Sequence, residues 1–231
     1  MATFVLVHGA WQGGWSYKQI ARMLRAEGHE VYVPTCTGLG ERSHLAHPGI
    51  TLGTHVTDVA NVLEYEDLND VILVGHSYGG MVITGVSGRC AGRIRTLVYL
   101  DAFLPADGQS LWDIAGDDAR AFYVNSQKAT PGMVPFIGLA AVPDNDDAAE
   151  LRRRKLDHHP LLTLTEAVKL DGSEQAIRNR TYILATKGPG FQRFYDQVRD
   201  DPAWTTRTIA TGHVVMMEDP DGLVKLLLQE V

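Results

Sequence analysis

The sequence predicts one α/β domain in which a mostly parallel sheet is flanked by helices and carries a small helical cap insertion. Short, continuously apolar runs alternate with helical patterns along most of the chain. Continuous apolar strands are typical of a parallel sheet that is covered on both faces. The 231 residues are enough for one sizeable core and a modest insertion.

Six β-rich runs, most of them apolar, are predicted strands: Thr3–Val7, Glu30–Val33, Val71–Val74, Thr96–Leu100, Thr181–Ala185 and Thr205–Ala210. Helical patterns lie between them, with Gly28 as the expected stop of the first and Pro220 as the expected start of the last. The predicted helices end near Glu27, span Thr51–Leu68, run from Tyr78 to about Cys90 and begin near Pro220.

Residues 103–173 break this alternation, because they are rich in proline and read as short helices and loops. Long irregular insertions in compact domains are often active-site lids. The sequence therefore predicts an α/β core formed by residues 1–102 and 174–231, with residues 103–173 as a cap over the C-terminal edge of the sheet.

Composition and charge favour a cytoplasmic protein that acts on a small molecule. The net charge of −7 argues against a nucleic-acid partner, which needs a basic face. The N-terminus lacks the pattern of a signal peptide, and no apolar run has the length of a membrane span. Cys36 and Cys90 are expected to be free thiols in a reducing compartment. The oligomeric state stays open.

A Gly-x-Ser-x-Gly motif, Gly75-His-Ser-Tyr-Gly79, directly follows a predicted strand and directly precedes an apolar helical run. In this setting the serine lies on a sharp, strained turn that exposes its hydroxyl, and the glycines let strand and helix approach closely. The structural alternative is a capping serine in a glycine-rich turn. The context favours Ser77 as a nucleophile.

A nucleophilic serine acting on a carbonyl needs backbone N–H donors for the oxyanion that develops. One donor is expected from Tyr78, the residue after the nucleophile. The other is expected from Ala10, in the glycine-rich turn after the first strand. That turn lies at the end of a strand where open α/β sheets bind ligands.

The predicted general base is His213, because a serine hydroxyl needs an adjacent base to become nucleophilic. His213 follows the last predicted strand, so it lies at the same sheet edge as Ser77. In this type of site the chain order is nucleophile, acid, histidine. His8 is expected to pack in its loop, and His76 is expected to point away from the serine. His158 and His159 are expected to be solvated or to pack in a loop. Three further histidines precede the nucleophile, contrary to the expected chain order: His44, His47 and His55.

The predicted acid is Asp101, which closes the strand Thr96–Leu100 and so lies at the catalytic edge. The usual alternative position, after the strand Thr181–Ala185, has no carboxylate nearby in the sequence. The next acid downstream, Asp196, falls within a helical pattern. A cap carboxylate such as Asp157 remains open, and so does a capping role for Asp101 in the next turn.

Together these residues resemble the α/β-hydrolase superfamily, through the run Phe4-Val-Leu-Val-His-Gly-Ala-Trp-Gln-Gly-Gly-Trp15, the elbow Gly75–Gly80 and Gly212-His213. The resemblance covers nearly the whole chain. It is strongest to the small branch that contains plant methyl-salicylate esterases, hydroxynitrile lyases and bacterial esterases of aromatic esters, pyrethroids and carbamates.

Two departures from this branch matter. Its plant members carry the acid where this sequence has Gly188, whereas Asp101 resembles the placement in some haloalkane dehalogenases, whose aspartate nucleophile is absent here. Hydroxynitrile lyases have a threonine where Gly9 stands and a lysine where Val214 stands. The resemblance therefore implies an esterase rather than a lyase.

The expected activity is hydrolysis of a small, hydrophobic or aromatic ester, carbamate or amide through an acyl-enzyme, with no metal or organic cofactor. Two alternatives remain, a hydroxynitrile lyase and a non-catalytic ligand-binding protein of the same fold. Substrate contacts are expected from aromatic and apolar residues near the site, although core packing explains them equally well: Trp11, Phe103, Trp112, Phe136 and Val214.

Overall fold

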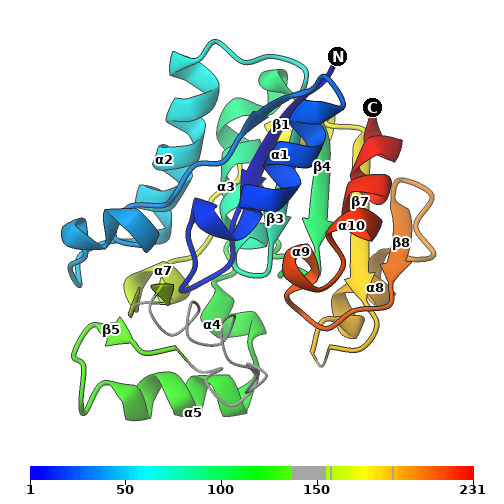
Figure 1. The fold of residues 1–231 in the computed structure, drawn as a ribbon. Helices are drawn as coiled ribbons and strands as arrows, with labels where there is room; N and C mark the ends of the chain where they lie inside the picture. Colours follow the sequence, from blue (N-terminus) through cyan, green and yellow to red (C-terminus); the bar gives the residue numbers. More distant parts are fainter. Residues whose placement is uncertain (137–154, 157, 189) are drawn as a thin grey trace.

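The computed structural model describes residues 1–136, 155–156, 158–188 and 190–231 (Figure 1). One parallel sheet has the strand order β2-β1-β3-β4-β7-β8. Its strands are β1 (Thr3–Val7), β2 (Glu30–Tyr32), β3 (Val71–His76), β4 (Ile94–Leu100), β7 (Asn179–Ala185) and β8 (Thr205–Ile209). The predicted strands are confirmed, and β3 continues to His76, directly before the glycine-flanked serine.

Helices cover both faces of the sheet, as the continuously apolar strands require. Alternate residues of β1 enter different cores: Phe4 and Leu6 pack in one, Val5 and Val7 in the other. The first core is closed by α1 (Lys18–Ala26) and α10 (Pro220–Leu227), and the second by α2 (Leu52–Tyr65), α3 (Gly79–Cys90) and α8 (Gln192–Val198).

The helix ends follow local chemistry. Gly28 ends α1 in a left-handed conformation with φ +84°, as predicted. A reciprocal pair of side-chain bonds between Thr51 and Thr54 starts α2. This helix ends at Tyr65, three residues before the predicted end at Leu68, because Asp67 takes a positive φ of 48° that a helix cannot contain.

Residues 103–173, called the inserted segment below, come between β4 and β7 in the sequence. Short helices were predicted there, and a two-stranded antiparallel sheet was not. Its described elements are α4 (Leu111–Ile114), α5 (Asp117–Ser126), β5 (Met133–Val134), β6 (His159–Pro160) and α7 (Leu162–Thr165). The elements α4, α5, β5 and α7 of this segment lie beyond the C-terminal ends of the strands (Figure 1).

The described residues also include several short helical elements. They are 3-10 helices η1 (Gly14–Tyr17), η2 (Gly40–Leu45), η3 (Ala91–Arg93), η5 (Ser173–Ala176) and η6 (Leu228–Glu230), and the α-helix α9 (Val215–Glu218). Across the described ranges, no helix combines the length and the apolar character needed to cross a bilayer.

Candidate active site

Ser77 occupies the turn between β3 and α3 with a φ of 55°, in the left-handed region that residues other than glycine rarely adopt. Its backbone is fixed by neighbouring strand ends: its N–H donates to Leu100 O at 3.3 Å and its carbonyl accepts from Phe103 N at 3.1 Å. A Cβ on Gly79 would lie 2.8 Å from Val7 O, so only glycine fits at this crossing of α3 and β1. The elbow geometry therefore follows from the motif.

His213 and Asp101 form a hydrogen-bonded pair at the same edge of the sheet. The Nδ1–H of His213 donates to Asp101 Oδ2 at 2.6 Å. The other carboxyl oxygen of Asp101 accepts from the backbone N–H of Ala185 at 3.1 Å. The Asp101 side chain is 1% exposed, and its φ of 43° turns the chain at the end of β4. The predicted acid and base are thus in direct contact.

Two rings that the sequence analysis did not assign to the site pack on His213. The ring of Phe191 stacks on it at 4.7 Å with an interplanar angle of 5°. The ring of His76 lies 4.6 Å away on a tilted plane, and its Nε2–H donates to the His213 carbonyl at 2.8 Å. Burial, together with the nearby His213, lowers the pKa of His76 well below its usual value, so His76 is neutral.

The loop that carries His213 is held on both sides. The Gly212 N–H donates to a carboxyl oxygen of Glu218 on α9 at 2.7 Å. The Lys187 N–H, after β7, donates to Thr211 O at 2.9 Å. Because Nδ1 of His213 carries the proton shared with Asp101, Nε2 is the unprotonated nitrogen that can act as a base.

The turn after β1 lies against the serine. A Cβ on Gly9 would lie 3.1 Å from Ser77 Cβ and 3.0 Å from His76 Nδ1, so this turn and the elbow touch. The neighbouring Ala10 is 8% exposed. Within the part of the chain that the structure describes, neither the Ala10 N–H nor the Tyr78 N–H has an intramolecular hydrogen-bond acceptor. Both expected oxyanion donors are therefore available to a ligand.

Buried histidines support the residues around these donors. The Tyr78 hydroxyl contacts His55 Nδ1 at 2.8 Å, while His55 Nε2 contacts Thr37 O at 2.9 Å. A carbonyl only accepts, so His55 carries its proton on Nε2, and Tyr78 donates to Nδ1. Burial lowers the pKa of His55 to about 4. His8 has the loop-packing role expected of it, since its ring bonds to Cys36 N and Gly9 O.

Of the alternative acids, Asp196 is described by the structure and has no hydrogen bond to His213. Asp196 lies on α8 and pairs with Arg199 at 3.2 Å. Asp157 lies outside the described residues. Among the described residues there is also no group of three or more metal-ligating side chains placed to hold an ion.

The expected substrate residues have different surroundings. Phe103 packs on Phe191 and Phe194 beside the His213 ring, with ring centroids 5.1 and 5.6 Å apart. Val214 packs against the core that α1 and α10 close. The rings of Trp11 and Phe136 pack on each other at 5.8 Å.

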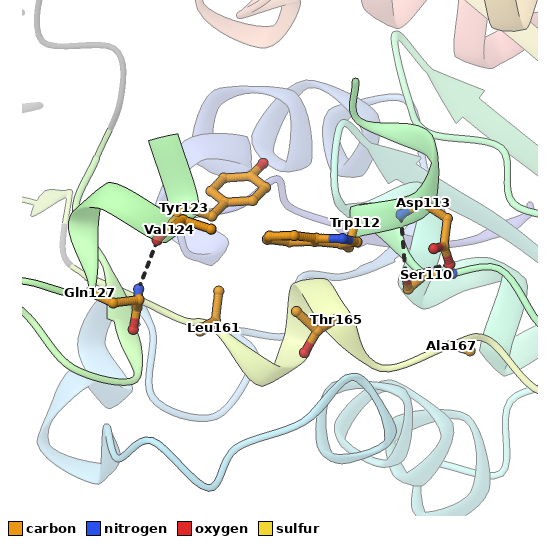
Figure 2. A pocket seen from close by; sticks show the side chains of 9 residues that line it. All are labelled: Ser110, Trp112, Asp113, Tyr123, Val124, Gln127, Leu161, Thr165 and Ala167. Atoms are coloured by element: carbon orange, nitrogen blue, oxygen red, sulfur yellow. Dashed lines mark hydrogen bonds between the residues drawn. The ribbon is translucent and has the colours of Figure 1, made fainter. Parts of the chain in front are cut away.

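Trp112 lines a pocket of about 490 Å³ between α4, α5 and α7 (Figure 2). Its indole faces the ring of Tyr123, with Leu161 on the neighbouring wall. The described lining is mainly apolar and comes from the inserted segment; Ser77, Asp101 and His213 do not belong to it.

The sequence matches the model of the alpha/beta hydrolase family over residues 4–226. It is 40% identical over 238 residues to the carbendazim hydrolyzing esterase of Nocardioides sp. (strain SG-4G), which covers 98% of each chain. It is 35% identical over 103 residues to salicylic acid-binding protein 2 of Nicotiana tabacum, covering 44% of this chain and 40% of that protein.

A solved structure also matches along the whole chain. It is that of an extracellular alpha/beta-hydrolase from a Paenibacillus species, with a TM-score of 0.87 at 25% identity, and it covers 100% of this chain and 99% of the other. The matched relatives fall in the small branch that the motifs resemble. The chain is a hydrolytic enzyme and belongs to the alpha/beta hydrolase family.

Proposed function

We propose that this enzyme hydrolyses small hydrophobic or aromatic carboxylic esters, carbamates included, through an acyl-enzyme on Ser77. The observation that carries the proposal is the 2.6 Å bond between His213 and Asp101 at the sheet edge that also presents the strained Ser77 elbow. This arrangement supports Ser77, His213 and Asp101 as the nucleophile, base and orienting acid of a serine-hydrolase triad.

In the proposed reaction the Ser77 oxygen attacks the carbonyl carbon while His213 Nε2 takes its proton. Asp101 holds the Nδ1–H tautomer and stabilises the imidazolium. The N–H groups of Ala10 and Tyr78 bind the tetrahedral oxyanion. Collapse breaks the bond to the alkoxy group, which leaves as an alcohol with the proton from His213. Water then attacks the acyl-enzyme, with His213 again as base, and releases the acid and Ser77.

The surroundings of the site support an apolar substrate. Phe191 stacks on the base, and Phe103 packs on Phe191. Small-molecule sites are usually apolar clefts with a few convergent polar groups. The name of the Nocardioides relative supports carbamate-like substrates for this chain as well. In this proposal residues 103–173 act as the cap over the site.

The location proposed from the sequence is the cytoplasm. In the structure Cys36 and Cys90 are both free, and Cys36 is buried with a raised thiol pKa. Free thiols are typical of reducing compartments.

The test is hydrolysis of p-nitrophenyl acetate and butyrate, and of carbendazim, by the wild type and by Ser77→Ala. We expect turnover of at least one ester that falls by about 10⁴-fold or more in the variant. The control is Ser43→Ala, a change of the same kind in η2, outside the proposed site. Turnover that persists in Ser77→Ala, or absence of turnover in the wild type, would contradict the proposal.

A further inference from the structure

Trp11, the residue after Ala10, is held at two points by the small sheet of the inserted segment. Its backbone N–H donates to Nδ1 of His159 on β6 at 3.3 Å. Its indole N–H donates to the carbonyl of Val134 on β5 at 2.8 Å. Val134 and His159 are direct partners in the antiparallel pair. One short sheet therefore fixes both the backbone and the side chain of Trp11.

The backbone of Trp11 needs such support. Its φ is 61°, a left-handed conformation that a bulky residue rarely adopts and keeps only where surrounding contacts impose it. The Ala10 amide lies one residue away, so relaxation of Trp11 would turn the amide that is proposed to bind the oxyanion.

The hydrogen bonds around His159 assign its tautomer. The hydroxyl of Thr163 donates to Pro160 O at 2.7 Å, so its oxygen accepts from His159 Nε2–H, also at 2.7 Å. Nδ1 is then the unprotonated nitrogen and accepts from Trp11. His159 has no exposed surface, and burial, with His55 and His8 nearby, holds its pKa well below the usual value. At neutral pH Nδ1 therefore stays unprotonated and can accept the hydrogen bond from Trp11.

His159 also contacts the other side of the proposed oxyanion hole. Its ring meets the ring of Tyr78 edge-on at 4.8 Å and 76°. Tyr78 carries the second proposed donor amide. A single buried side chain from the inserted segment therefore touches the residues that carry or adjoin both donors.

We propose that His159 is a positioning residue for the hydrolytic reaction: its Nδ1 lone pair holds Trp11, and thereby the Ala10 amide, in place for the oxyanion. The inference rests on the proposed function. It also couples the inserted segment to the chemistry, since β5 and β6 form the support. The role is indirect, because His159 acts through the backbone of Trp11.

Two variants distinguish the effect of losing the Nδ1 acceptor from the effect of changing the side-chain packing. His159→Phe keeps a ring but removes the acceptor, whereas His159→Asn is smaller and keeps an acceptor near the position of Nδ1. We expect His159→Phe to lower kcat about 10- to 100-fold with KM changed less than about threefold, because oxyanion contacts strengthen in the transition state. We expect His159→Asn to keep kcat within about fivefold of wild type.

A merely structural role predicts the opposite order. Asn leaves the larger void at a buried site and would lower the melting temperature more than Phe does. If kcat of the His159 variants varies with their melting temperatures and not with the presence of an acceptor at this position, the proposal is overturned. The control is His44→Phe, the same substitution at an exposed position of η2, for which we expect wild-type kcat and KM.

Hydrogen exchange gives a second readout that needs no turnover. The Trp11 amide should exchange faster in His159→Phe than in the wild type or in His159→Asn, as measured by mass spectrometry of peptides covering residues 8–14. Unchanged exchange, or a kcat of His159→Phe within threefold of wild type, would overturn the positioning role. Failure of the proposed function has a different signature: the wild type itself would lack ester turnover, while exchange at Trp11 would still respond to His159→Phe.

Discussion

Replacing Asp101 with asparagine tests the pairing on which the proposed triad depends. Of the two oxygens of Asp101, one accepts from the Ala185 N–H in β7 and the other from His213 Nδ1–H. Asparagine has a single oxygen. The Ala185 N–H is fixed in the sheet, so that oxygen stays with it and the new NH₂ group faces His213.

An NH₂ group donates, so Nδ1 of His213 must then accept, and the ring proton moves to Nε2. The nitrogen that should take the proton of Ser77 is then already protonated. We expect kcat/KM to fall by about 10⁴-fold, the loss seen when a triad acid becomes its amide. This corresponds to about 5.4 kcal/mol of transition-state stabilisation, at about 1.36 kcal/mol for each tenfold change.

The assay is kcat/KM for p-nitrophenyl acetate, with the melting temperature measured on the same samples. The control is Asp107→Asn, the same change at an exposed carboxylate of the inserted segment, for which we expect wild-type activity. A loss of less than about tenfold in Asp101→Asn would refute the assignment. It would move the acid to another residue, with Asp157 as the first to test.

Three further predictions concern the surroundings of the site. Phe191→Ala removes the ring stacked on His213 and should lower kcat about tenfold with a smaller change in KM; an unchanged kcat would show that the stack does not orient the base. Tyr78→Phe leaves His55 Nδ1 without its donor and should lower the free energy of unfolding, measured with urea, by about 1–3 kcal/mol. Because the backbone amide remains, kcat should stay within about tenfold of wild type. A variant as stable as the wild type would contradict this prediction. The pKa of His55 is about 4 in the folded chain and near 6.5 when unfolded, so between these values the unfolded chain binds more protons. The free energy of unfolding should therefore fall as pH drops from 7 to 4, by up to about 3 kcal/mol from this group, and equal urea midpoints at pH 5 and 7 would exclude it.

The sheet could be predicted from the sequence because its central strands contain short apolar runs and the edge strands are short β-rich runs between turn signals. The runs near Phe4 and Leu73 are apolar at every position, which is typical of strands buried on both faces. The elbow could be predicted as well, since glycine spacing and strand–helix context are both local. The end of α2 was misplaced because the turn signal of Asp67 and Asn69, residue types that tolerate a left-handed conformation, was not used.

The contacts around His213 could be predicted only in part. Asp101 and His213 were paired by their places at strand ends, which is a matter of topology. Phe191 and His76 could not be assigned, because their ring contacts depend on how separate loops close over the sheet edge. His159 could not be assigned to the site for a similar reason, because β6 is two residues long and has no periodic pattern.

Covalent labelling tests directly whether Ser77 is a nucleophile activated by His213. The measurement is mass spectrometry of the enzyme after reaction with diisopropyl fluorophosphate, followed by peptide mapping, for the wild type and for His213→Ala. We expect one phosphoryl group per wild-type chain, located on Ser77, and labelling that is slower by several orders of magnitude in His213→Ala. A wild type that stays unlabelled, or a label on another residue, would contradict this expectation.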